Sequence, residues 1–386
     1  MPGRAALYHR PGSMIKTLDR YVVREMVGPF AFGVGLFTLL FFSAETLGGV
    51  TRLMVESQTG LEVIARYLLY RLPQALVFTF PMAVMLSALL TFGRLSADHE
   101  LTALKASGIG FLRVATPALA FCAAASAVGF WLSDTVAPAA NRQALNLLLE
   151  HQGAEQLQNS LISLPRVLPN GQVQVSFILM LNTRTREATG VYVHYSYNNV
   201  RRREIYAQKA RWNGRAWEFR DVTVVDYDEQ GRPVAEATSA QGWSTLTAAA
   251  PPTPQELLQR RLRPEEMTRA QLAEALRQLP QSGESPERLA RETRKYLMSY
   301  HQKLAIPLAC FIFGLFAVPL GVRPQRTSTS IGLGLSLVFI LLYYVLMTLG
   351  AVLGESGATS PLWGAWLPNL FFGVLGAGLL AGSGRT

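Results

Sequence analysis

LPQALVFTFPMAVMLSALLTF, the stretch from residue 72 to residue 92, contains no charged side chain. A helix needs about 20 apolar residues to cross the hydrocarbon core of a bilayer, which is roughly 30 Å thick. Within that core every backbone amide must be hydrogen-bonded inside its own segment, and a helix meets this requirement. Buried helices of soluble proteins rarely reach this length without a charge, so we predict that residues 72–92 span a membrane.

Five further stretches resemble this one in length and in their near absence of charge. With 72–92 they form two groups of three, separated by about 170 polar, strand-like residues. This layout predicts an α-helical membrane protein with six transmembrane helices, three before and three after an inserted domain. The five stretches are Gly28–Ala44, Val114–Ser133, Leu304–Val322, Ile331–Leu353 and Leu362–Gly382. The predicted parts are an N-terminal segment (1–27), spans one to three (28–135), the insert with a helical linker (136–300) and spans four to six (301–386).

The composition fits a membrane bundle with one soluble domain, because 49% of the 386 residues are hydrophobic and only 16% are charged. The formal net charge of +10 does not indicate a nucleic-acid partner, since Lys and Arg collect in short loops beside the spans. Cys122 and Cys310 both lie in predicted spans, and no Cys/His spacing is typical of a metal site. We therefore expect no disulfide, metal or cofactor in this chain.

Two catalytic motifs are excluded. His99-Glu100 resembles the start of the zinc-protease motif H-E-x-x-H, but position 103 is alanine and the second ligand is missing. No G-x-x-x-x-G-K-[ST] motif occurs, so the chain cannot by itself hold a nucleotide in a P-loop. We expect no catalytic residue.

The positive charges predict the orientation in the membrane. Residues 1–27 and the loops after spans two and four are rich in Lys and Arg, whereas the loops after spans one and five carry more Glu. Because positively charged short loops stay in the cytoplasm, both termini are predicted there and the insert on the opposite side. No convincing processing site follows the first span, so we expect an uncleaved anchor, with Met1 or Met14 as the start.

Residues 16–27 predict an amphipathic helix on the cytoplasmic surface, because one face collects apolar side chains. These are Leu18, Tyr21, Val22 and Met26.

Within the insert, hydrophobicity alternates with a period of two from about residue 160 to 249. Such alternation over Gln172–Phe177, Gly190–Tyr197 and Ala216–Tyr227 predicts strands, and the hairpin-type turn signals suggest an antiparallel sandwich or roll. The turn signals are Pro169-Asn170-Gly171, Asn213-Gly214 and Gln230-Gly231. We interpret the polar groups of this region as solvated strand faces; they are His194, Asp221, Asp226 and Asp228. In the linker, Thr268 and Gln271 predict a capping box that opens a helix over Arg269–Leu279.

The cytoplasmic loop GRLSADHELTALKASGIG, residues 93–110, is the most informative short segment. Ser96 suits an N-cap, and Asp98 and Glu100 favour the positive end of a helix. Gly108 suits the left-handed position after a helix. These signals predict a helix of about three turns over 96–107, with Leu101 and Leu104 on its apolar side. Such a helix either docks into a groove on a cytoplasmic partner or lies on lipid.

The chain resembles the lipopolysaccharide export permease family, the LptF/LptG type of ABC-transporter membrane subunit, over nearly all of residues 14–386. The segments that carry the resemblance are LDRYVVRE, GRLSADHELTALKASG, AQKARWNGRAWEFRDV, RPEEMT, HQKLAIPLACFIFGLFAVPLGVR, GLGLSLVFILLYYVL and WLPNL. The resemblance implies that the insert is a periplasmic β-jellyroll and that spans one and five are the gates. It also implies two permease subunits, identical or related, that enclose a lipid in the inner membrane.

The same resemblance implies the partners. Two copies of a cytoplasmic ATPase, which bind ATP and Mg²⁺, would contact the coupling helix 96–107 of each subunit, and Glu100 matches the acidic residue that engages them. The candidate residues of this coupling helix are Asp98, Glu100, Leu101, Leu104, Ser107 and Gly108. The jellyroll would pass extracted lipopolysaccharide to a bridge of similar jellyroll domains that reaches the outer membrane.

Cations at the outer rim are expected to meet the phosphates of the lipid, because Arg binds phosphate through its planar fork. The candidates are Arg52, Arg66 and Arg71, which alternatively snorkel to ordinary headgroups. Members of the family often carry a basic residue where this chain has Glu45, which leaves open a related glycolipid with a different headgroup. Other hypotheses are an ATPase-driven mechanotransmission protein that carries no lipid, a membrane-bound lipid enzyme and a scaffold.

Overall fold

The computed structural model describes residues 11–45, 60–151, 162–167, 172–182, 187–197, 200–239, 244–245, 263–281, 286–322 and 329–383. The chain divides into two compact units. The membrane unit contains Met1–Leu47, Arg71–Pro138 and Met298–Thr386, and the β unit contains Gly48–Tyr70 and Ala139–Leu297.

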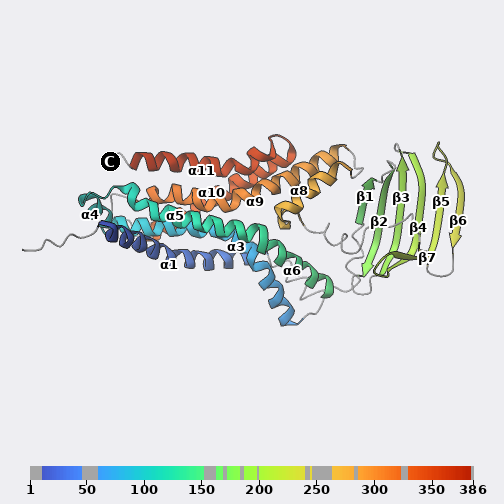
Figure 1. Cartoon of the computed structure of the whole chain (residues 1–386), viewed down its shortest axis with the longest axis horizontal. Helices are drawn as coiled ribbons and strands as arrows, with labels where there is room; N and C mark the ends of the chain where they lie inside the picture. Colours follow the sequence, from blue (N-terminus) through green and yellow to red (C-terminus); the bar gives the residue numbers. More distant parts are fainter. Residues whose placement is uncertain are drawn as a thin grey trace, which may run out of the picture. The chain divides into compact units, whose positions relative to one another are not determined.

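The helices bear out the prediction of six membrane spans. Within the described residues, six helices are long and apolar enough to cross a membrane, and three precede and three follow the strands. The helices are α1 (Pro11–Glu45), α3 (Leu61–Ala97), α4 (Glu100–Ala106), α5 (Phe111–Trp131), α6 (Ala137–His151), α8 (Arg269–Gln278), α9 (Pro286–Gly321), α10 (Thr329–Ser356) and α11 (Pro361–Ser383) (Figure 1). A π-helical turn, Leu132–Val136, joins α5 to α6.

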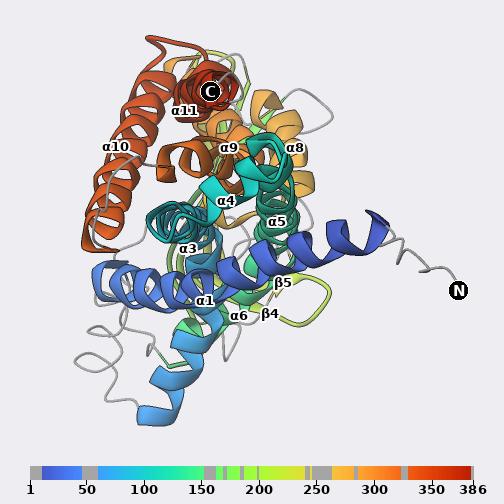
Figure 2. The same ribbon diagram turned by 90° about the vertical axis from the view of Figure 1, so that its left-hand side faces the viewer.

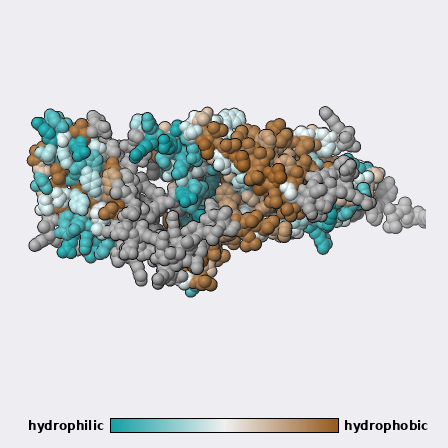
Figure 3. Space-filling view, turned by 180° about the vertical axis from the view of Figure 1, so that it is seen from behind, coloured by the Kyte–Doolittle hydropathy of each residue, from teal (hydrophilic) through white to brown (hydrophobic). Residues whose placement is uncertain are grey.

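Helix α3 is the centre of the membrane unit. Buried residues make up 72% of its span, against 22% for the spans of α1 and α10. Figure 2 shows α3 between α1 and α10, and hydrogen bonds join it to both. Apolar side chains gather on the surface of the membrane unit, whereas the sheet is largely hydrophilic (Figure 3). The outer helices therefore present the apolar surface that a lipid environment requires.

Helix α1 unites the predicted amphipathic segment with the first span in one continuous helix, although Pro29 lies inside it. Proline has no N–H to donate to the carbonyl four residues earlier, which belongs to Glu25. The Thr91 hydroxyl of α3 donates to that carbonyl at 3.2 Å, and the Ser87 hydroxyl donates to the carbonyl of Met26 at 2.7 Å. Hydroxyls of α3 thus supply the donor that Pro29 lacks. The predicted apolar face is confirmed, since it packs into the core of the membrane unit.

Helices α9, α10 and α11 are fastened to one another by a buried polar pair. The Tyr343 hydroxyl donates to Asn369 Oδ1 at 3.2 Å, and Asn369 Nδ2 donates to the carbonyl of Ala305 at 2.7 Å. Nearby, Gly350 and Gly364 bring the backbones of α10 and α11 so close that a Cβ on either residue would clash with the carbonyl of the other. The three helices are therefore expected to move as one body.

The β unit contains an antiparallel sheet in the order β1-β2-β3-β4-β5-β6, with β7 paired to β5. The inserted antiparallel domain is confirmed, and the described strands follow an up-and-down order. One face of the sheet is a buried apolar cluster that includes Val193, Ile205 and Phe219. The strands are β1 (Ile162–Val167), β2 (Val173–Asn182), β3 (Glu187–Tyr197), β4 (Val200–Trp212), β5 (Trp217–Tyr227), β6 (Pro233–Ser239) and β7 (Ser244–Thr245).

Two of the three predicted turns are confirmed. Gly214 (φ 97°) and Gly231 (φ 76°) both adopt left-handed conformations between strands, where glycine has no Cβ to clash. The signal at residues 169–171 lies outside the described residues. The capping box of Thr268 and Gln271 is also confirmed, and the helix that it opens is α8.

The polar groups of the sheet that the sequence singled out serve strands and turns. Arg203 of β4 pairs with Asp226 of β5 and holds the pKa of that carboxyl below its usual value. Asp228 accepts hydrogen bonds from the backbone of the following turn. His194 Nδ1 lies 3.4 Å from Glu204 on the neighbouring strand. Asp226, Asp228 and His194 thus each have a polar neighbour within the sheet, whereas Asp221 adopts a left-handed φ of 53° in β5.

We predict that Gly364→Val destabilises the protein, because the new side chain meets the carbonyl of Gly350. Overpacking of this kind costs about 1–3 kcal/mol. Gly378→Val is the matched control, since it lies on the same helix and a Cβ there meets nothing within 4 Å. Thermal unfolding of the purified protein in detergent measures both, and equal melting temperatures for the two variants would contradict the close helix crossing.

Candidate functional site

The predicted coupling helix is shorter than expected. The predicted start at Ser96 is wrong, because α3 continues through Ala97 and α4 begins only at Glu100. Leu95 is buried in the core of the membrane unit, and this burial extends α3 beyond the capping signal. The chain turns at His99, whose φ of 60° is left-handed, a conformation in which His is enriched among non-glycine residues.

The end of α4 is as predicted. Gly108 has a φ of 84° and donates its N–H to the carbonyl of Lys105 at 3.0 Å. Ile109 N–H donates to the carbonyl of Leu104, also at 3.0 Å, so the two bonds form a Schellman motif. Ser107, the last of the predicted coupling residues before the glycine, is exposed. This end fixes the direction in which the chain enters α5.

The apolar side of α4 packs against its own bundle. Leu101 is only 4% exposed, and both Leu101 and Leu104 pack with the core of the membrane unit. Asp98 and the opposite side of α4 are exposed, including Thr102, Ala103, Lys105 and Ala106. A partner that meets α4 would therefore contact this polar side. Glu100 is half-buried at the boundary between the two sides.

Three polar contacts join the N-terminal part of α1 to the region of α4, one each to α3, α4 and α5. The Tyr21 hydroxyl donates to Glu100 Oε2 at 2.7 Å. Arg94 Nη2 lies 2.7 Å from Glu25 Oε2. The third contact is bidentate, since Arg113 Nη1 and Nη2 lie 2.7 and 3.0 Å from the two carboxylate oxygens of Asp19. We call these six residues the α1–α4 clamp.

The charges of this region are not all balanced. Arg94 forms an ion pair with Glu25 and also lies 4.0 Å from Asp98. Arg113 forms an ion pair with Asp19. Within the part of the chain that the structure describes, Glu100 has no Lys or Arg within 4.0 Å. Its one described polar contact is the neutral hydroxyl of Tyr21. The contact of Glu100 with a partner, expected from the sequence, stays a prediction.

The predicted headgroup residues are placed only in part. Arg52 lies outside the described residues, and Glu45 is the last residue of α1. Arg66, in the β unit, is exposed and pairs with Glu62 one helical turn earlier. Arg71 belongs to the membrane unit and is half-buried. The described residues do not test the predicted headgroup role of these four side chains, which stays a prediction.

Sequence reasoning missed Lys303 of α9. Its side chain is 5% exposed, and its ammonium donates to the carbonyl of Ser133, in the π-helical turn, at 2.9 Å. The signal was present, because Lys303 directly precedes the predicted span that begins at Leu304, and an ionisable group at membrane depth normally has a specific partner. It stabilises a turn in which the regular helix hydrogen bonds are shifted.

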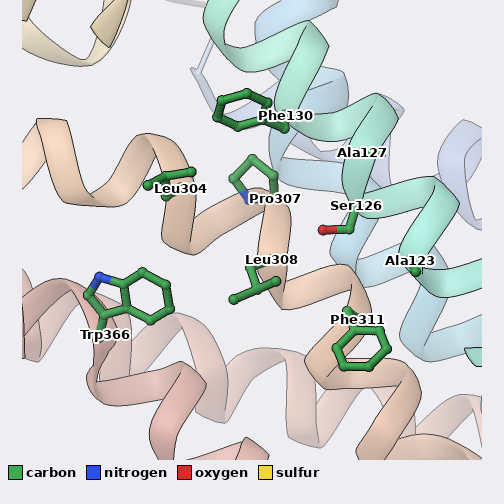
Figure 4. A pocket seen from close by; sticks show the side chains of 9 residues that line it. All are labelled: Ala123, Ser126, Ala127, Phe130, Leu304, Pro307, Leu308, Phe311 and Trp366. Atoms are coloured by element: carbon green, nitrogen blue, oxygen red, sulfur yellow. The ribbon is translucent and has the colours of Figure 1, made fainter.

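A shallow groove of about 380 Å³ lies between α5 and α9 (Figure 4). Its walls include Ala123, Ala127, Leu304 and Pro307, with Trp366 from α11 across from them. The Ser126 hydroxyl is nearly the only polar side-chain group there, so the groove lacks the convergent polar groups of an active site. No group of three or more metal-ligating side chains occurs among the described residues.

The comparisons with known proteins agree with this architecture. The family described as lipopolysaccharide export system permease LptF/LptG matches residues 20–381. Two curated relatives, each called lipopolysaccharide export system permease protein LptG, come from Escherichia coli strain K12 and from Escherichia coli O6:H1 strain CFT073. Each is 26% identical over 389 residues, which cover 94% of this chain and 97% of the relative.

A match over nearly the whole chain, together with six spans around an antiparallel β domain, leads to one conclusion. The chain belongs to the LptF/LptG family of lipopolysaccharide export permeases and is a multi-pass protein of the inner membrane.

Proposed function

We propose that this chain is the permease subunit of an ABC transporter that extracts lipopolysaccharide or a related glycolipid from the inner membrane. The observation that carries the proposal is α4, a short helix bound to α1 through Glu100, whose carboxylate has no Lys or Arg within 4.0 Å among the described residues. A separate cytoplasmic ATPase, which binds ATP and Mg²⁺, contacts α4 through a cation that meets Glu100. The relatives are named as export permeases, which fits a transport subunit without its own reaction.

The lipid lies between this subunit and a second permease subunit, identical or related. One copy has little room for a lipid with several acyl chains, since aromatic rings such as Phe313, Phe316 and Phe372 fill its core. The outward faces of α1 and α10 remain apolar and exposed, as illustrated by Leu39 (74%) and Leu341 (66%). Exposed apolar faces of this extent indicate contact with lipid or with a partner. We place the two gates there.

Extraction of the lipid requires an energy source. Each CH₂ withdrawn from a bilayer costs about 0.8 kcal/mol, so extraction of a lipid with several acyl chains costs tens of kcal/mol. Release without an energy source would be far too slow, and ATP-driven closure of the two subunits must expel the lipid in stages. The groups that bind the lipid phosphates are arginines near the outer rim, with Glu45 as a further headgroup contact.

The proposed function also implies an orientation of the chain in the membrane. In this proposal α4 and both termini lie in the cytoplasm, and the β unit lies in the periplasm. The described sheet ends in β1 and β6, and no other described strand pairs with their outer edges. A periplasmic bridge of similar β domains would add its strands to such an edge and receive the lipid.

We predict that Glu100→Ala abolishes ATP-dependent lipid release from proteoliposomes while the permease dimer remains intact. Loss of one member of a buried charge pair at an interface lowers affinity more than about tenfold. Glu229→Ala removes an exposed carboxylate from the turn after β5 and is the control. Undiminished release by the Glu100 variant, with the dimer confirmed by size-exclusion chromatography, would remove the coupling role.

A second prediction concerns the outer-rim cations. Changing Arg52, Arg66 and Arg71 together to Ala should reduce photocrosslinking of lipopolysaccharide to the permease several-fold, since each arginine contributes a charge-assisted hydrogen bond to phosphate. A triple variant of sheet and linker arginines serves as the control; it replaces Arg215, Arg220 and Arg277. Unchanged crosslinking in the first variant would show that these arginines only snorkel to ordinary headgroups.

A further inference from the structure

The Tyr21 hydroxyl binds one of the two oxygens of the Glu100 carboxylate. Its ring packs against the core of the membrane unit, and its hydroxyl donates to Glu100 Oε2 at 2.7 Å. Arg94 Nη2 lies 3.4 Å from the same hydroxyl oxygen, so the tyrosine is placed by packing and by a second polar contact. An exposed glutamate has several freely rotating bonds, whereas this one is held in a single direction.

An ionised carboxylate accepts hydrogen bonds with both of its oxygens. In the described part of the chain, Oε2 is occupied by Tyr21 and Oε1 has no hydrogen-bond partner. No Lys or Arg of the described residues approaches Glu100 within 4.0 Å. The arrangement leaves one carboxylate oxygen for a cationic side chain of another protein.

We propose that Tyr21 is a positioning residue for coupling: it orients Glu100 toward a cation of the ATPase and transmits the resulting force directly to α1. This inference rests on the proposed function and adds to it the route between the ATPase and a gate helix. A partner bound at Oε1 and Tyr21 bound at Oε2 contact the same carboxylate. When the partner displaces that carboxylate, the displacement is therefore passed on to Tyr21.

The remaining contacts of the α1–α4 clamp explain why α1 responds as a whole. Arg94 holds Glu25, and Arg113 holds Asp19, within two turns of Tyr21 on the same helix. Farther along, hydroxyls of α3 bond α1 at Glu25 and Met26. The part of α1 from Asp19 to Met26 therefore moves together with α3, α4 and α5, and the continuous helix carries the motion to its exposed apolar part.

The test is a double-mutant cycle in proteoliposomes that contain both permease subunits and the ATPase. The variants are Tyr21→Phe, which removes only the hydroxyl, Glu100→Ala, and the two combined. The dissociation constant of the ATPase and the lipid released per ATP hydrolysed are measured for each. Tyr206→Phe is the matched control, because it removes the hydroxyl of an exposed tyrosine in β4. Melting temperatures show whether every variant is folded.

We expect Tyr21→Phe to raise the dissociation constant of the ATPase about tenfold, the ratio expected for a hydrogen bond to a charged group. The lipid released per ATP should fall with it, while Tyr206→Phe changes neither quantity. In the Glu100→Ala background, Tyr21→Phe should have no further effect, since the two residues act through one contact.

The other outcomes separate two failures. If Glu100→Ala impairs coupling but Tyr21→Phe behaves as the unaltered protein, or if the two effects add, the positioning role is overturned and the proposed function stands. If Glu100→Ala has no effect on ATPase binding or on lipid release, the proposed coupling itself is wrong. Should Tyr21→Phe lower the melting temperature, Glu100→Gln gives a second measure. It keeps an acceptor for Tyr21 and loses the charge, so it should weaken ATPase binding without a change in stability.

Discussion

The requirement that buried backbone groups be hydrogen-bonded determines how α1 is built. Pro29 removes the donor for the carbonyl of Glu25, and a buried carbonyl left without a partner costs about 1–3 kcal/mol. The Thr91 hydroxyl of α3 replaces that donor at 3.2 Å, and Ser87 bonds the next carbonyl at 2.7 Å. The helix therefore stays continuous, so its clamped first turns and its exposed apolar part belong to one stiff element.

The architecture was predictable from the sequence wherever it depends only on a local sequence preference or on the requirements of the bilayer. Six long stretches almost without charge form helices in lipid, because a helix bonds every backbone group within its own segment. Gly108 ends α4 because few other residues adopt its left-handed conformation. The start of α4 was not predictable in this way. An N-cap at Ser96 contributes about 1 kcal/mol, whereas burial of the neighbouring Leu95 contributes about 1.5–3 kcal/mol, so tertiary packing extended α3 past the cap.

The candidate site was predictable only in its outline. The amphipathic pattern placed Tyr21 on the inward face of its helix, and this face does pack into the core. The contact with Glu100, 79 residues away, depends on how α1 crosses α3 and could not be inferred from periodicity. The same holds for Lys303, whose partner carbonyl lies 170 residues away in a π-helical turn.

The α1–α4 clamp contributes more to the orientation of α1 than to the free energy of folding. Partly exposed ion pairs such as those of Arg94 and Arg113 contribute little to folding, because water and salt screen them. These two ion pairs and the hydrogen bond from Tyr21 to Glu100 converge on two turns of α1, where they fix orientation at small energetic gain. Glu100 fits the proposed coupling role, because its described polar contact is the Tyr21 hydroxyl and no Lys or Arg of the described residues lies within 4.0 Å of it.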